Sequence, residues 1–286
     1  MVPLNGIAPH FLKLKESGVP GPHLVVAPKT LMDNWISEIK NFSGNTLKIF
    51  LCDAIQRFNP GSINMSDVVL TTYDTLRINQ ASFGTIDWNM VVCDEAQYAK
   101  NPTTQRTTAL KALKSKHRAA LTGTPVENGL IEFWCIMDFV QPGLLGSWTD
   151  FRKNYERPII EDDEEKRENK INELLENIRG HYLRRLKDDV IDDLPKKSVT
   201  VMETSLSDKQ FEFYKEIAGE AKSGGRGKML AAIGKLLRLC ACPEENGQVL
   251  GLSHCPKMAD TLELLKQIRE KDEKVLIFSD FKLLRL

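Results

Sequence analysis

Two acidic residues in the middle of the chain follow directly after a short apolar run. Asp94 and Glu95 come after the run MVVC at residues 90–93. Hydrolysis of a nucleoside triphosphate needs a divalent cation that neutralises phosphate charge, and a carboxylate that orients or deprotonates the attacking water. Asp94 suits the Mg²⁺ role through a bound water, and Glu95 suits the role of activating the attacking water. Taken alone, the pair is explained equally well as two acids in the first turn of a helix, where the backbone dipole is positive.

A second apolar run ends in the same way. The run AAL at residues 119–121 is followed by Thr122-Gly123-Thr124-Pro125. A short apolar run that ends abruptly in polar residues is typical of a buried parallel strand whose carboxyl end opens onto a ligand crevice. Between the two runs, Asn101-Pro102 predicts the cap of a helix that continues to about residue 113. The sequence therefore predicts two neighbouring strands that feed one site.

Strands and helices are predicted to alternate upstream of these runs. Strands are expected at residues 23–27, 47–51 and 67–71, and helices at residues 31–42 and 72–79. In the first of these helices Leu31, Trp35, Ile39 and Phe42 fall on one face. The alternation predicts a parallel α/β sheet. All four tryptophans of the chain are expected to be core residues and not platforms on which bases stack.

The character of the chain changes after residue 130. Up to about residue 187 the patterns are helical and no strand is expected. A strand is then expected at residues 198–204, and helices at about 210–222 and 228–240, the first of them begun by a capping box of Ser207 and Gln210. The end returns to α/β character, with an amphipathic helix at residues 257–269 and a strand at 274–279.

Composition restricts the partners and the compartment. The 286 residues carry 39 basic and 39 acidic side chains, so a nucleic-acid partner is not implied by net charge and needs a local basic face. Six cysteines in a chain of this size are typical of reduced thiols in a cytosolic protein. No run reaches the roughly 18 apolar residues of a membrane span. The amino-terminal segment does not have the pattern of a signal peptide.

A series of short motifs lies in a fixed order along the chain. They are Leu24-Val25-Val26-Ala27-Pro28, Asp67 to Tyr73, Asp94-Glu95-Ala96-Gln97, Lys100-Asn101-Pro102, Leu121 to Pro125, Leu183-Arg184-Arg185, Leu237-Arg238 and Lys274 to Ser279. This series, over roughly residues 23–281, resembles the ATPase core of the SWI/SNF-type family within helicase superfamily two. That family contains the DNA translocases of chromatin remodelling and their bacterial relatives.

The resemblance implies a fold and a division into domains. The fold class is α/β: a RecA-like parallel-sheet lobe, a helical insertion after it, and the start of a second RecA-like lobe. The expected boundaries are residues 1–140 for the first lobe, 141–255 for the insertion and the linker between lobes, and 256–286 for the start of the second lobe.

The resemblance also implies roles at the ATP site. Asp94 corresponds to the acid that holds Mg²⁺ through water, Glu95 to the acid that activates water, and Gln97 to the last letter of the DEAQ box. Thr122, Gly123 and Thr124 correspond to the motif that couples the nucleotide site to the DNA groove. ATP and Mg²⁺ are the implied cofactors.

Double-stranded DNA is the implied partner, held by its phosphate backbone without sequence specificity. The corresponding loops contain Pro28 with Lys29, and Thr71 with Thr72 and Tyr73, while Arg184, Arg185 and Lys187 correspond to the basic linker between lobes. Hydroxyls, backbone amides at helix starts and a lysine can hold phosphates without reading bases.

The sequence departs from the family in two places. The phosphate-binding motif G-x-x-x-x-G-K-S/T does not occur, and the segment upstream of residue 23 has instead the pattern of the helix that follows such a loop. The glycine-rich motif and the arginine of the second lobe do not occur either. We therefore expect this chain to be a fragment that hydrolyses ATP poorly, since loss of the arginine alone costs on the order of 10³-fold or more.

Three functions agree with these observations. The favoured one is an ATP-dependent translocase that moves on double-stranded DNA without separating its strands. A strand-separating helicase of the same superfamily is the first alternative. The long helical insertion favours the translocase over this helicase. A non-catalytic fragment that binds DNA or a protein partner is the second, supported by the missing phosphate loop. The expected location is the cytoplasm, in association with the nucleoid, for a bacterial protein and the nucleus for a eukaryotic one.

Overall fold

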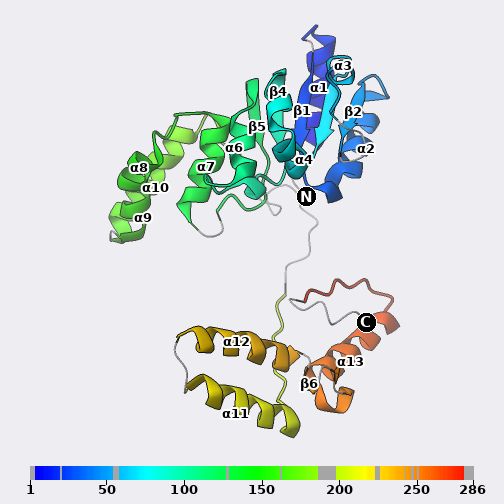
Figure 1. Cartoon of the computed structure of the whole chain (residues 1–286), viewed down its shortest axis with the longest axis vertical. Coiled ribbons are helices and arrows are strands. Elements are labelled where there is room, and N and C mark those ends of the chain that lie inside the picture. Colours follow the sequence, from blue (N-terminus) through cyan, green and yellow to red (C-terminus); the bar gives the residue numbers. More distant parts are fainter. Residues whose placement is uncertain are drawn as a thin grey trace. The chain divides into compact units, whose positions relative to one another are not determined.

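The chain forms two compact units, Met1–Val190 and Ile191–Leu286 (Figure 1). The computed structural model describes residues 4–19, 21–53, 58–126, 129–161, 163–185, 198–222, 226–241, 243–245, 248–249 and 251–279. Among the described residues, no helix is long and apolar enough to cross a membrane.

A five-stranded parallel sheet is the centre of the first unit. Its strands are β1 (His23–Val26), β2 (Ile49–Cys52), β3 (Val68–Thr71), β4 (Asp87–Cys93) and β5 (Lys114–Ala120), in the order β2-β3-β1-β4-β5. In the register, His23 of β1 lies opposite Val68 of β3 and Met90 of β4. The predicted parallel α/β sheet is confirmed. β1 and β4, which precede the predicted phosphate-contacting loop and the acidic pair, are neighbours inside the sheet.

Helices cover both faces of this sheet (Figure 1). Alternate residues of a strand point to opposite faces, so Val25 packs with Phe11 and Trp35, while Val26 packs with Leu76 and Leu110. The first face is covered by α1 (Leu4–Glu16) and α2 (Met32–Ser43), and the second by α4 (Tyr73–Ile78), α6 (Gln105–Lys111) and α7 (Leu130–Val140). Short elements complete the unit: η1 (Lys29–Leu31), α3 (Pro60–Asn64), α5 (Gln80–Phe83) and η2 (Ala96–Ala99).

The helix between β4 and β5 begins later than the sequence predicts. Asn101 was expected to cap it, but the N-cap is Thr104, whose Oγ1 accepts a hydrogen bond from the amide of Thr107 at 3.4 Å. The Oδ1 of Asn101 accepts instead from the amide of Thr103, at 3.0 Å. An asparagine side chain that bonds the backbone two residues on forms a local turn. Asn101 therefore begins a turn that precedes the helix.

A second apolar cluster lies beside the sheet, formed by α7 and the helices after it. These are α8 (Trp148–Phe151), a π-helical turn η3 (Arg152–Glu156), α9 (Arg157–Glu161) and α10 (Glu164–Ile178). Phe151 and Ile178 are fully buried in this cluster, which also contains Phe133 and Trp134 of α7. Other residues of α7, Ile136 among them, pack against the sheet. α7 thus joins the helical part to the sheet, and the predicted helical character of this region is confirmed.

The second unit is mainly helical in its described residues. It contains α11 (Asp208–Lys222), α12 (Arg226–Ala241) and α13 (Pro256–Glu270), with the short antiparallel pair β6 (Glu244–Glu245) and β7 (Gln248–Val249) and the turn η4 (Leu252–His254). The predicted capping box is confirmed. Ser207 Oγ accepts from the amide of Gln210 at 3.3 Å, and Gln210 Oε1 accepts from the amide of Ser207 at 3.1 Å.

Two predicted strands do not form. Residues 198–204 and 274–279 have no regular secondary structure, and Val201 and Leu276 are 80% and 83% exposed. A strand needs a neighbour that pairs with its amides and carbonyls, and within the described ranges no strand pairs with either segment. Of the predicted second-lobe start, residues 256–279 are described, and α13 is the regular element among them. The predicted boundaries at residues 140 and 255 remain predictions.

Candidate active site

The carboxyl ends of β1, β3, β4 and β5 bring the predicted site residues up to Thr124 to one edge of the sheet. The backbone there is closely tied: the amide of Asp94 donates to the carbonyl of Val26 at 2.8 Å, and the amide of Leu121 donates to Cys93 at 2.8 Å. The amide of Ala96 donates back to Leu121 at 2.9 Å. The segments after β1, β4 and β5 are therefore held side by side. The predicted meeting of the two strand ends is confirmed.

Asp94 is a buried carboxylate with a donor on each oxygen. Its residue is 6% exposed. Its Oδ2 accepts from the indole Nε1 of Trp35 at 2.8 Å, and its Oδ1 accepts from the amide of Glu95 at 2.9 Å. Burial raises the pKa of Asp94, the two hydrogen bonds lower it, and the charge of Glu95 raises it again. A carboxylate in this setting gains from a nearby cation, which compensates for its lost hydration.

The donor set fits a magnesium ion. Mg²⁺ is bound in proteins through one or two carboxylates, with several waters and the phosphates of the substrate. Asp94 and Glu95 are consecutive carboxylate residues at the end of β4, and each oxygen of Asp94 keeps one lone pair beyond the hydrogen bond that it accepts. Among the described residues there is no group of three or more Asp, Glu, His or Cys side chains that would form a separate protein-only cage.

Glu95 has an unusual backbone conformation. Its φ and ψ are 50° and 53°, in the left-handed region that non-glycine residues seldom adopt. This conformation turns the chain from the end of β4 into η2. The Oε2 of the half-buried Glu95 accepts from the amide nitrogen Nε2 of Gln97 at 2.5 Å. Backbone strain of this kind is typical of functional sites, where surrounding contacts hold a residue in place.

A line of hydrogen bonds continues from Glu95 to the motif after β5. The hydroxyl of Thr122 donates to Oε1 of Gln97 at 2.8 Å, and the amide of Thr124 donates to the hydroxyl oxygen of Thr122 at 3.1 Å. Gly123 lies exposed between the two threonines. The structure therefore brings Glu95, Gln97, Thr122 and Thr124 together. The coupling role of the motif remains a prediction.

Of the residues predicted to hold DNA phosphates, some lie at the surface or at a helix start, and others are buried with their hydroxyls already engaged. Lys29 is exposed in η1 directly after Pro28, and Thr72 is the N-cap of α4, with its Oγ1 accepting from the amide of Thr75 at 3.1 Å. The hydroxyl of the fully buried Thr71 donates to the carbonyl of Cys52 at 2.8 Å. The hydroxyl of Tyr73, which is 3% exposed, donates to the carbonyl of Asp94 at 2.7 Å.

The hydroxyls of Thr71 and Tyr73 are buried and donate to backbone carbonyls, so these two hydroxyls do not face phosphate. Tyr73 supports the acidic site instead. The role of the loop in DNA binding remains a prediction. Arg184 and Arg185 are exposed in an irregular segment after α10. Lys187 lies outside the described residues.

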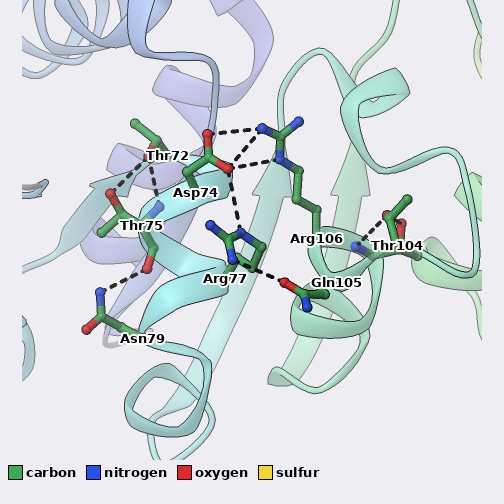
Figure 2. A network of polar contacts seen from close by, with 9 residues as sticks. Thr72, Asp74, Thr75, Arg77, Asn79, Thr104, Gln105 and Arg106 are labelled. Carbon is green, nitrogen blue, oxygen red and sulfur yellow. Dashed lines mark hydrogen bonds and ion pairs between the residues drawn. The ribbon is translucent and has the colours of Figure 1, made fainter.

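Figure 2 shows how α4 is held against α6. The guanidinium of Arg106 donates from Nη2 to both oxygens of Asp74, at 2.9 and 3.0 Å, and from Nε to Oδ1 at 3.1 Å. Arg77 of α4 donates to the side chain of Gln105 at 3.1 Å. Both arginines are thus engaged with neighbouring side chains. Their contacts fix α4, whose N-cap Thr72 lies next to the acidic site.

Comparison with known proteins decides the family. The SNF2-related domain matches residues 8–270 of this chain. The chain belongs to the SNF2-related family. The match covers both the sheet with its acidic edge and the helices up to α13.

Relatives in this SNF2-related family come from distant organisms. YwqA of Bacillus subtilis is 35% identical over 95% of this chain, and the ISWI chromatin-remodeling complex ATPase CHR11 of Arabidopsis thaliana is 28% identical over 92%. The SWI2/SNF2 ATPase core of Sulfolobus solfataricus, solved in complex with double-stranded DNA, has 31% identity over 95% of this chain and a TM-score of 0.57. The chain spans 31% of YwqA, 26% of CHR11 and 58% of the Sulfolobus chain.

The sequence did not predict that two further residues of this SNF2-related chain contact Asp94. Trp35 was expected to be a core residue only, and it is also the donor to Asp94. Tyr73 was predicted only to contact DNA, and its hydroxyl also donates to the backbone carbonyl of Asp94. A third link, the ion pair between Lys100 and the buried Glu132 at 3.0 Å, ties the loop after η2 to α7. Spacing along the sequence gives no signal for any of these contacts, which join separate elements.

Proposed function

We propose that this chain supplies the hydrolytic acids and the coupling motif of an ATP-driven motor that moves along double-stranded DNA. The observation that carries the proposal is the line of hydrogen bonds from Glu95 through Gln97 and Thr122 to Thr124. It links the acids after β4 to the motif after β5. The name of CHR11 as a chromatin-remodeling ATPase and the DNA complex of the Sulfolobus core support the same proposal.

The acids divide the work of hydrolysis between them. A bound Mg²⁺ supplies positive charge against the phosphates of ATP. Asp94 would hold that ion through water, because its carboxylate is fixed at both oxygens by donors. Glu95 orients the attacking water and takes up a proton at its carboxylate. Gln97 holds Glu95 in place through its amide, since the Nε2 donates to Oε2.

Because the chain has no net charge, contact with DNA takes place through exposed basic side chains and backbone amides at particular places. The exposed Lys29, the amides at the start of α4 behind Thr72, and Arg184 with Arg185 are suited to phosphate oxygens. Such contacts do not read the base sequence. We therefore propose binding that depends strongly on salt and little on sequence.

Hydrolysis by the chain alone is proposed to be slow, because its 286 residues contain no G-x-x-x-x-G-K-S/T motif to hold the phosphates of ATP. The test measures phosphate release from ATP and Mg²⁺ over long incubation, with and without a blunt-ended duplex. We expect slow release that rises with DNA and disappears in Glu95→Gln. Glu168→Gln, on the exposed face of α10, is the control.

Release that is unchanged in Glu95→Gln, or unaffected by DNA, would contradict the motor function. Rapid release would contradict the slow hydrolysis proposed for this chain. A strand-displacement assay separates the translocase from the helicase, because a translocase leaves the strands of the duplex paired. Salt-dependent DNA binding without any Glu95-dependent release would favour a non-catalytic binding function.

A further inference from the structure

Trp35 of α2 reaches across from the helical layer to the acidic site. Its side chain is fully buried, and its Nε1 donates to Oδ2 of Asp94 at 2.8 Å, although 59 residues separate the two in sequence. The rest of the indole packs in the apolar cluster that contains Val25 and Val92 of the central strands. The ring is therefore fixed by packing, and its N–H is fixed with it.

The hydrogen bond determines how the carboxylate of Asp94 lies. The terminal torsion of an aspartate is broad and roughly two-fold, so one donor leaves the carboxylate plane free to rotate. Here Oδ1 is held by the amide of Glu95 and Oδ2 by Trp35. With both oxygens held, the remaining lone pair on each has a fixed direction. Those lone pairs are the ones that a cation or its bound water can use.

An indole is well suited to this task. Its Nε1–H is a donor only and has no charge. A lysine or arginine at this place would bring a positive charge that competes with the cation, and an aliphatic side chain would leave one oxygen of a buried carboxylate without a donor. The indole satisfies that oxygen and leaves the negative charge of Asp94 for the metal.

We propose that Trp35 is a positioning residue of the ATP site, which fixes the Asp94 carboxylate for a divalent cation. The proposal rests on the metal role of Asp94 in the proposed function. A role in packing alone is the competing explanation. Trp88 separates the two, because it is also buried, at 1% exposed, and its Nε1 also donates, to the carbonyl of Phe83 at 3.1 Å. It packs on the opposite face of the sheet.

The test uses Mn²⁺ alone as the probe and the whole 286-residue chain. Free Mn²⁺ is measured by electron paramagnetic resonance for wild type, Trp35→Phe, Trp88→Phe and Asp94→Asn, and thermal unfolding is recorded for each. Phe keeps most of the ring volume and removes the donor. We expect Asp94→Asn to abolish Mn²⁺ binding at this site. Trp35→Phe should weaken the affinity for Mn²⁺ about tenfold, and Trp88→Phe should leave that affinity unchanged.

Two outcomes overturn the proposal in distinguishable ways. If Asp94→Asn abolishes Mn²⁺ binding and Trp35→Phe binds as wild type does, the positioning role fails and the metal role stands. If wild type and Asp94→Asn bind Mn²⁺ equally, the metal role in the proposed function fails, and the positioning role fails with it.

A second measurement covers the case that Trp35→Phe does not fold. The indole ¹H–¹⁵N signals of the wild-type chain are followed during a titration with Mg²⁺, and compared with those of Asp94→Asn. We expect the signal that Asp94→Asn displaces to be the one that Mg²⁺ shifts to saturation. A Mg²⁺ titration that shifts none of the indole signals, or a different one, would overturn the proposal.

Discussion

The hydroxyl of Thr122 donates to Oε1 of Gln97 at 2.8 Å, although 25 residues separate the two in sequence. The Nε2 of the same side-chain amide donates to Oε2 of Glu95. A glutamine amide has one accepting and one donating end. With both ends engaged, the amide has one orientation that satisfies both neighbours. A displacement of the segment after β5 would therefore change the support of Glu95, the proposed water-activating acid, directly.

Replacement of Thr122 by Val tests this link. Val keeps the shape of Thr and removes the hydroxyl, so Oε1 of Gln97 loses its donor. We expect DNA-stimulated phosphate release to fall about fivefold, the equivalent of one hydrogen bond of about 1 kcal/mol, with a smaller effect on release without DNA. Thr108→Val is the control, since Thr108 is exposed on α6 and its hydroxyl donates to the carbonyl of Thr104, the N-cap of the same helix. An equal fall with and without DNA would show that Thr122 does not couple the two sites.

Glu95→Gly tests the strain at the end of β4. Glu95 has a φ of 50°, which glycine adopts without cost and other residues adopt at about 1 kcal/mol. Glu95→Gly and Glu95→Ala both remove the carboxylate, so both should lose phosphate release. We expect the glycine variant to be more stable than the alanine variant by about 1 kcal/mol in urea unfolding. An alanine variant of equal or greater stability would contradict the assigned strain.

The sequence predicts what depends on local patterns. β1, β3 and β4 lie within a few residues of their predicted ranges, because each is a short buried apolar run. The acids follow β4 as expected, and parallel neighbours bring strand ends to one edge whatever the details of packing. Asn101 shows the limit of local rules, since an asparagine can cap a helix or bond its own turn and both fit the same letters.

Contacts between distant elements could not be predicted. The bond from Trp35 to Asp94 depends on how α2 lies against the sheet, and a buried tryptophan looks the same in sequence whether or not its N–H has a special partner. The apolar segments at residues 198–204 and 274–279 have the composition of strands. Strand formation, however, requires a partner strand, which composition does not supply.

His23 makes the stability of the first unit depend on pH. It is 2% exposed, and burial lowers its pKa from 6.5 to about 4, against a raising effect of Asp67 and with a further lowering by His10. The unfolded chain binds the proton more readily, so stability is full above about pH 6.5 and is lost as pH falls towards 4. We expect a loss of about 2 kcal/mol between pH 7 and pH 5 from this group.

The measurement compares wild type with His23→Phe in urea unfolding at several pH values. Phenylalanine cannot take up a proton, and His23 already stacks on the ring of Phe11 with centroids 4.9 Å apart. The difference in stability between the two chains should therefore change by about 2 kcal/mol over this interval, in favour of the variant at low pH. A difference that stays constant from pH 7 to pH 5 would show that His23 does not titrate as described.

Loss of Lys100 alone is expected to lower the free energy of unfolding strongly, and removal of the Glu132 charge as well is expected to restore most of it. The Nζ of Lys100 lies 3.0 Å from Oε1 of Glu132, and the side chain of Glu132 is only 8% exposed. Removal of one member of a buried pair leaves a charge without its counterion, whereas removal of both charges does not. We expect Lys100→Met to lower the free energy of unfolding by about 3 kcal/mol, and Lys100→Met with Glu132→Gln to regain most of that loss.

Lys170→Met is the matched control, because its pair with Glu173 on α10 lies at the surface and its loss should leave stability almost unchanged. A double variant as unstable as Lys100→Met would show that the contact stabilises the loop after η2 by packing and not by charge.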